Sequence, residues 1–283
     1  MEAELDHHVA ANLWLAIRDR LDRSLPKWTQ RIEDLGQVAY VECREAGSHW
    51  SDDQVFEALL RAVLSNNTDW AKVERVLPEL RDAFSGFSLH RYAETTDQDV
   101  ERRLVPWFKH RKAGSMTLRR SLVGLAQTAR ILRDWSTSRG SAEQYFLDVI
   151  RSSGADPKEA AVALGEAGST KKLPALGVPI AAESLRNMGF DLCKPDRHVC
   201  RAIGSFGLVQ FRKWTDRTGT KSPASSVSEM LETMTVVEKI ARIIGERPTF
   251  VDNAIWLLCC KGGIHMSNAE LVSMVSDIGA SRE

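Results

Sequence analysis

Apolar residues recur at helical spacing through most of this chain, and no segment shows the alternation of apolar and polar residues that is typical of a half-buried strand. Residues three and four positions apart lie on one face of a helix, so the pattern predicts an all-α fold. Ser51-Asp52-Asp53-Gln54 has the form of a capping box and precedes an apolar run from Val55 to Leu64. Residues 215–226 are rich in Thr, Ser, Gly and Pro and are expected to form a loop.

Periodicity and break residues together predict the helix positions. The expected helices are 9–23, 28–45 as one helix or two, 55–64, 70–84, 96–107, 111–137, 141–152, 157–167, 179–188, 196–206, 225–244 and 250–260.

Composition narrows the class of protein. The chain has 283 residues, 43% hydrophobic and 27% charged, which is ordinary for a folded globular protein. No apolar run approaches the roughly 18 residues of a membrane span, and the acidic N-terminus does not resemble a secretion signal. The five cysteines and seven histidines show no ligand spacing. We therefore expect a cytoplasmic, nucleoid-associated or nuclear protein that is not secreted, does not contact a membrane, and has neither a metal nor another cofactor.

The charge balance is informative only locally. The 38 basic and 38 acidic residues cancel, which by itself argues against strong nucleic-acid binding. Basic residues nevertheless gather in Lys109-His110-Arg111-Lys112, in Lys171-Lys172 and between Lys194 and Arg201. An uneven surface field is therefore possible.

The segment Leu173-Pro174-Ala175-Leu176-Gly177-Val178-Pro179 reads as a tight turn between two helices. Pro174 ends the first helix, and Gly177 permits a close backbone approach or a positive φ. The start of the second helix would offer free N–H groups to an anion. Plain helix–helix packing explains the same residues, and the sequence leaves both interpretations open.

A second feature follows in Lys194-Pro195-Asp196-Arg197-His198-Val199. Asp196 stands where an apolar-periodic helix begins, so it is expected to cap that helix. A capping carboxylate with one oxygen free stays ionised, and it could also stabilise a developing cation or orient a water molecule.

These segments, in this order, resemble the helix-hairpin-helix base-excision DNA glycosylases, the superfamily that includes endonuclease III and the alkylbase glycosylases. Residues 58–70 resemble the first barrel helix and the polar turn that enters the lesion site. Phe108 to Ala113 is similar to the segment in which a helix end precedes a basic helix that contains Lys-Ala. Leu173 to Ala181 resembles the hairpin, and Pro195 to Val199 resembles the segment with the catalytic aspartate. The resemblance covers about 52–210, and weakly the helices around 250–256.

The resemblance implies a role for each matching residue. Asp196 would be catalytic, and Asn66 and Asn67 would lie at the base pocket. Asn67 would fill the gap in the base stack or contact the orphan base; alternatively, it only caps the helix at Trp70. The partner would be double-stranded DNA containing a modified base, bound by a monomer. The residues expected to contact this DNA are Lys172, Gly177, Val178, Arg197, His198, Arg201 and Asn67.

Departures from the family pattern refine the expected activity. Members that also cleave the backbone carry a lysine at the position that aligns with Pro179, so the resemblance implies a monofunctional glycosylase. Lys171, Lys172 and Lys194 leave open a lyase that uses a non-standard lysine. The four-cysteine cluster of endonuclease III has no counterpart in this sequence. Cys259 and Cys260 are adjacent, and we expect them to be buried thiols.

The expected architecture is a two-lobed helical bundle with a cleft between the lobes. One lobe would be 52–190, including the hairpin at about 166–190; the other would combine 1–51 with 191–283 and carry Asp196. Two further hypotheses stay open: a DNA-binding helix-hairpin-helix protein without enzymatic activity, and a helical scaffold in which Gly177 and Asp196 are packed away from any groove.

Overall fold

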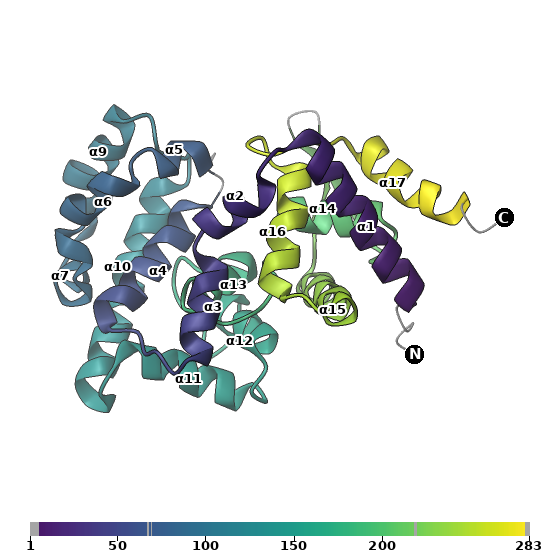
Figure 1. Ribbon diagram of the computed structural model, residues 1–283. Coiled ribbons are helices and arrows are strands. Elements are labelled where there is room, and N and C mark those ends of the chain that lie inside the picture. Colours follow the sequence, from purple (N-terminus) through teal and green to yellow (C-terminus); the bar gives the residue numbers. More distant parts are fainter. Residues whose placement is uncertain (1–5, 67, 69, 218–219, 281–283) are drawn as a thin grey trace. The chain divides into compact units, whose positions relative to one another are not determined.

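The computed structural model describes residues 6–66, 68, 70–217 and 220–280. In these residues the regular secondary structure is helical apart from one two-stranded antiparallel sheet (Figure 1). The predicted all-α class is therefore confirmed. None of the described helices is both long and apolar enough to cross a membrane.

The chain divides into two compact units, residues 1–41 with 191–283 (unit 1) and residues 42–190 (unit 2). The first boundary lies ten residues before the expected one at 51 and 52. Helix α3 (Gln37–Glu45) crosses it, and its Arg44 belongs to unit 2, where the guanidinium donates to the carboxylate of Glu143 at 2.8 Å and stacks on the rings of Trp50 and Phe190. These contacts hold the end of α3 and the following segment in unit 2.

Unit 2 is built around helix α4 (Asp52–Leu64), whose eight buried residues contact α10 and α13. The predicted capping box is present, since Ser51 and Gln54 bond each other's backbone N–H groups. The other helices of unit 2 are α5 (Trp70–Glu74), α6 (Leu77–Ala83), η1 (Ser85–Phe87), α7 (Leu89–Ala93), α8 (Asp97–Asp99), the π-helix η2 (Val100–Leu104), α9 (Val105–His110), α10 (Leu118–Arg139), α11 (Ala142–Ser152), α12 (Pro157–Gly165) and α13 (Val178–Asn187).

Unit 1 packs helix α1 against α15, α16 and α17 (Figure 1). Its elements are α1 (His7–Ser24), α2 (Trp28–Asp34), α14 (Arg197–Ser205), β1 (Trp214–Arg217), β2 (Thr220–Pro223), α15 (Val227–Ile244), α16 (Pro248–Cys259) and α17 (Asn268–Ala280). Cys259 and Cys260 are buried, as predicted.

Three expectations about local structure are wrong. The segment 215–226 is not a loop throughout, because β1 and β2 pair in it, with Trp214 opposite Pro223. Residues 70–84 form two helices rather than one, and Pro78 lies in the first turn of the second, α6. Helix α10 begins at Leu118 rather than near 111, since residues 111–117 form a turn in which Lys112 has a positive φ of 52°.

Candidate functional site

Asp196 caps helix α14 and keeps one carboxylate oxygen available. Its Oδ1 accepts hydrogen bonds from the backbone N–H groups of His198 at 2.8 Å and Val199 at 3.1 Å. Its Oδ2 accepts no hydrogen bond from the described residues, and the residue is partly exposed. The capping bonds thus fix the orientation of the carboxylate while the second oxygen stays open to a substrate or a water molecule.

The loop that carries Asp196 is tied to the first half of α16. Asp252, only 1% exposed, accepts hydrogen bonds at Oδ1 from the backbone N–H of Lys194 at 3.0 Å and the thiol of Cys193 at 3.1 Å. Asp191 accepts one from the backbone N–H of Thr249 at 2.9 Å. Two carboxylates therefore hold 191–194 in place. The sequence did not lead us to predict these two roles. Asp252 could have been found, because a lone carboxylate within the apolar run 250–256 indicates a buried group with hydrogen-bond partners.

His198 lies directly beside Asp196 at the start of α14. Burial lowers the pKa of its imidazole, and the Asp196 carboxylate opposes this shift. Arg197, one position earlier, is exposed. Of the predicted DNA-contacting residues of α14, Arg197 is therefore the one whose side chain is clearly accessible.

Arg201 does not have the exposure that a phosphate contact requires. It is 2% exposed, and its Nη1 donates to the carbonyl of Met266 at 2.8 Å and to Asn268 Oδ1 at 2.9 Å. Its Nη2 donates to the carbonyl of Cys259 at 3.4 Å. The expected phosphate contact is therefore wrong. The guanidinium of Arg201 bonds acceptors inside the protein and connects α14 to the C-terminal segment.

The hairpin joins α12 to α13, and its close packing depends on Gly165 rather than on Gly177. A Cβ atom at Gly165 would lie 2.4 Å from the backbone nitrogen of Val178. Gly177 has an ordinary extended conformation (φ −99°, ψ 169°), and the positive φ of the turn is at Ala175, at 65°. The nearest atom to a Cβ at Gly177 is Pro179 Cδ, 4.0 Å away. The tight packing of the hairpin is therefore at Gly165, and a side chain at Gly177 would meet open space.

The turn is also held from its other side by α10. Thr128 Oγ1 donates to the carbonyl of Pro174 at 2.6 Å, and a Cβ at Gly124 would lie 2.8 Å from the backbone nitrogen of Ala175. Tyr145 of α11 donates its hydroxyl to the carbonyl of Lys171 at 3.1 Å. The hairpin is therefore a rigid element of unit 2.

Lys172 is engaged within the hairpin. Its ammonium donates to the carbonyl of Gly165 at 2.8 Å and to the carbonyl of Leu176. Partial burial lowers the pKa of this amine. The expected phosphate contact is corrected here too, because Lys172 ties the end of α12 to the turn.

Two backbone N–H groups at the start of α13 lack acceptors, and of these two residues Gly177 is exposed while Val178 packs against Gly165. In the described part of the chain, the N–H groups of Gly177 and Val178 have no acceptor, and Pro179 has no N–H. The macrodipole adds positive potential at this end of the helix. The N-terminus of α13 thus combines free donors with an exposed glycine, as an anion site requires.

The predicted base-pocket asparagines lie in the turn after α4. Asn66 is partly buried, and its carbonyl accepts a hydrogen bond from Thr68 Oγ1 at 3.2 Å. Asn67 lies outside the described residues.

Comparison with known proteins addresses the fold. No family model and no curated protein matches this sequence. Solved structures match over most of the chain. The Methanocaldococcus jannaschii 8-oxoguanine glycosylase/lyase in complex with DNA containing 8-oxoguanine has a TM-score of 0.53 at 18% identity, covering 86% of this chain and 96% of that one. The 8-oxoguanine DNA glycosylase of Thermotoga maritima has a TM-score of 0.52 at 21% identity, covering 90% and 99%.

This chain has the fold of the 8-oxoguanine DNA glycosylases. A second structure of the Methanocaldococcus jannaschii enzyme gives a TM-score of 0.54 at 17% identity, with 90% of this chain and 97% of that chain covered. At such identities the likeness concerns the fold. The resemblance seen in the sequence is therefore confirmed at that level, and activity and substrate are matters for proposal.

Proposed function

We propose that this protein is a DNA glycosylase that hydrolyses the N-glycosidic bond of a damaged or modified base flipped out of duplex DNA. The observation that carries the proposal is the carboxylate of Asp196, oriented through Oδ1 and unengaged at Oδ2, in a chain with a glycosylase fold. A scaffold protein needs the cap but has no use for the second oxygen. A DNA-binding protein without activity likewise needs only the hairpin.

In this proposal Asp196 acts on the sugar. Positive charge develops on the deoxyribose as the base departs, and an ionised carboxylate stabilises that charge and positions the attacking water. A duplex hides the glycosidic bond, so the target nucleotide has to leave the base stack first. No metal or other cofactor is needed for these steps.

DNA would be held mainly by backbone groups and by Arg197. The free N–H groups of Gly177 and Val178 suit one phosphate, and Arg197 suits another. His198 is proposed to shape the surroundings of Asp196 as a neutral imidazole, and Asn66 to approach the base stack with Asn67. The working form is proposed to be a monomer acting where DNA is, in the cytoplasm or nucleoid, or in a nucleus.

The test is excision from duplexes that each carry one modified base. The first is 8-oxoguanine, the base named for the structural neighbours; an alkylated purine, a deaminated base and a mismatch follow. Strands are scored with and without hot alkali, because a monofunctional enzyme leaves an abasic site that breaks only in alkali. We expect the enzyme to act on one substrate, whose strand then breaks only when alkali is added.

Asp196→Asn is the matched variant, because asparagine caps a helix about as well as aspartate does. We expect its excision rate to fall by about 10²–10⁴-fold with an unchanged unfolding midpoint. Full activity in this variant would refute the role of Asp196. Absence of excision across the panel, with DNA binding intact, would instead indicate the binding protein.

Lys172 supports a second candidate, a glycosylase with lyase activity. A lowered amine pKa is what a Schiff-base nucleophile requires, although the amine of Lys172 is bonded to two carbonyls. Strand cleavage without alkali and borohydride trapping of a DNA–protein adduct would favour this candidate. Loss of the adduct in Lys172→Met, but not in Lys171→Met, would assign the nucleophile.

A further inference from the structure

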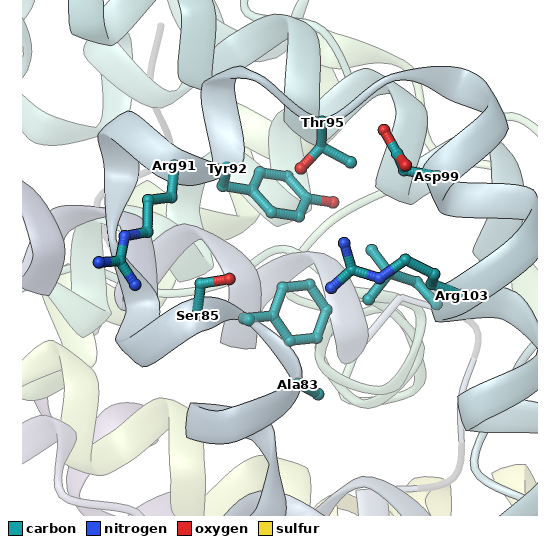
Figure 2. Close-up of a pocket in the computed structure, with 9 residues that line it drawn as sticks. Ala83, Ser85, Arg91, Tyr92, Thr95, Asp99 and Arg103 are labelled. Carbon is teal, nitrogen blue, oxygen red and sulfur yellow. The ribbon is translucent and has the colours of Figure 1, made fainter.

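Unit 2 contains a small pocket that the proposed glycosylase chemistry does not use. It has a volume of about 60 Å³ and lies among α6, η1, α7, Thr95, α8 and η2. Figure 2 shows the guanidinium of Arg103 pointing into it, with the hydroxyl of Ser85 opposite and those of Thr95 and Tyr92 above. A cavity of this size holds a few water molecules, so the pocket suits a small ion or chemical group rather than a whole nucleoside.

The polar groups of this pocket are mostly unengaged donors. Within the described residues, the hydroxyls of Ser85 and Thr95 and the guanidinium of Arg103 make no hydrogen bond or close ion pair. Arg91 lines the pocket as well; its guanidinium makes no hydrogen bond or ion pair with the described residues and points away from Arg103 (Figure 2). Donors that converge from three separate elements suit an oxyanion with several oxygen atoms.

The backbone that presents these donors is unusual on both sides of the pocket. Ser85, Gly86 and Phe87 have successive positive φ values of 54°, 77° and 65°. Arg103 lies on the π-helix η2, an element that occurs mostly as single turns and frequently at functional sites. Strained backbone also gathers at ligand sites, so both features agree with a binding role.

One acceptor stands among the donors. Asp99 Oδ2 accepts hydrogen bonds from the backbone N–H of Thr96 at 2.9 Å and from its hydroxyl at 2.6 Å. These bonds, with the charges of Arg103 and Arg102, lower the pKa of Asp99, so the carboxylate is ionised near neutral pH. Its Oδ1 accepts no hydrogen bond from the described residues. Two guanidinium groups and one carboxylate leave the lining with a net charge of +1.

A carboxylate beside an anion site is selective. It repels a fully ionised oxyanion but accepts a hydrogen bond from one that carries a proton. Sulfate and the phosphodiesters of a DNA backbone have no such proton near neutral pH, whereas inorganic phosphate and a protonated phosphate monoester do. We propose that this pocket binds a hydrogen phosphate group, with Arg103, Ser85 and Thr95 donating to its oxygens and Asp99 accepting from its hydroxyl. The source is either free phosphate or the terminal phosphate of a nucleotide.

Calorimetric titration of the full chain at pH 6 and fixed ionic strength tests this site, because about half of a phosphate monoester carries the proton at that pH. The four titrants are sodium phosphate, sodium sulfate, a deoxynucleoside 5′-monophosphate and a dinucleoside phosphodiester. We expect saturable binding of phosphate at a site that Arg103→Gln weakens, and no binding of sulfate or of the diester that this variant weakens. Binding of the monophosphate as well would identify a terminal phosphate as a ligand; binding of phosphate alone would identify the free ion.

Three variants test the assignment. Arg103→Gln is expected to weaken phosphate binding by about tenfold or more, and Thr95→Val to weaken it less. Arg102→Gln is the matched control, since Arg102 is on the same π-helix but does not line the pocket. Asp99→Asn retains a capping oxygen and is expected to let sulfate bind.

Three results would overturn the proposal: no saturable phosphate binding, sulfate binding that is as strong and equally weakened by Arg103→Gln, or equal losses in Arg102→Gln and Arg103→Gln. These readouts do not depend on base excision. Asp196→Asn should bind phosphate as the unmodified protein does, so failure of the glycosylase proposal and failure of this one are distinguishable.

Discussion

The carboxylate of Asp252 accepts a hydrogen bond from the backbone N–H of Lys194 at 3.0 Å, two residues before Asp196. The same oxygen accepts from the thiol of Cys193, and Asp252 is almost fully buried. Asp252 is therefore a positioning residue, which holds the loop of the proposed catalytic carboxylate against α16.

Replacing Asp252 should destabilise the protein. Asp252→Ala removes an acceptor from the partly buried N–H of Lys194, and we expect the free energy of unfolding to fall by about 2–3 kcal/mol. Asp252→Asn retains an acceptor oxygen and should lose less. Urea denaturation measures both values. Equal losses in the two variants would show that the charge, and not the acceptor, stabilises this loop.

Replacing Gly165 or Gly177 of the hairpin by alanine should affect stability and DNA binding differently. Gly165→Ala places a methyl group against the backbone of Val178, and we expect a loss of about 1–3 kcal/mol in the free energy of unfolding. Gly177→Ala fills open space, so its loss should stay below about 1 kcal/mol. Affinity for duplex DNA should fall in Gly177→Ala, because its methyl group obstructs the approach of a phosphate. Unchanged affinity would remove Gly177 from the DNA surface.

The two arginines of α14 offer a similar contrast. Arg201→Ala leaves the carbonyls of Cys259 and Met266 unpaired and should reduce the free energy of unfolding by at least about 3 kcal/mol. Arg197→Ala should leave stability within about 0.5 kcal/mol and reduce the slope of log K against log salt by about 0.9. Binding isotherms at several salt concentrations, with thermal unfolding of both variants, check this. An unchanged salt slope in Arg197→Ala would exclude a phosphate contact.

His198 should make stability depend on pH in the acidic range. Burial lowers its pKa below 6.5 in the folded state, so from pH 6.5 down to that lowered value the unfolded chain binds more protons. Stability therefore rises with pH up to about 6.5 and is lost as the pH falls. His198→Gln should remove this part of the dependence, as urea midpoints at pH 7 and pH 5.5 would show. The same dependence in both proteins would assign it to other groups.

Capping residues in the sequence correctly predicted where several helices begin. Ser51 and Asp196 cap their helices as expected, and the helix expected from residue 96 begins directly after Thr96, which caps it. The same reasoning could have found α17, because Ser267 and Glu270 bond each other's backbone N–H groups before it. The β1–β2 pair was not foreseeable by alternation, since each strand has only four residues.

The roles of basic side chains were harder to predict. Lys172 and Arg201 stand beside the expected motifs, but the acceptors of Arg201 lie 58 to 67 positions away in sequence, at Cys259, Met266 and Asn268. Proximity to a motif does not say whether a cation faces solvent or an internal carbonyl. That depends on tertiary packing, which the periodicity of one chain does not specify.

The chain leaves unit 1 after Val41 and returns to it at Asp191, so unit 2 is one continuous segment and unit 1 is not. During synthesis a ribosome therefore delivers all of unit 2 before the loop of Asp196 emerges, and unit 2 can fold first. Closing unit 1 then brings together segments separated by the whole of 42–190, at an entropic cost that grows only slowly with that length. The loop of Asp196 therefore reaches its place only after α16 has been synthesised. A growing chain has the hairpin of unit 2 before the Asp196 carboxylate is in position.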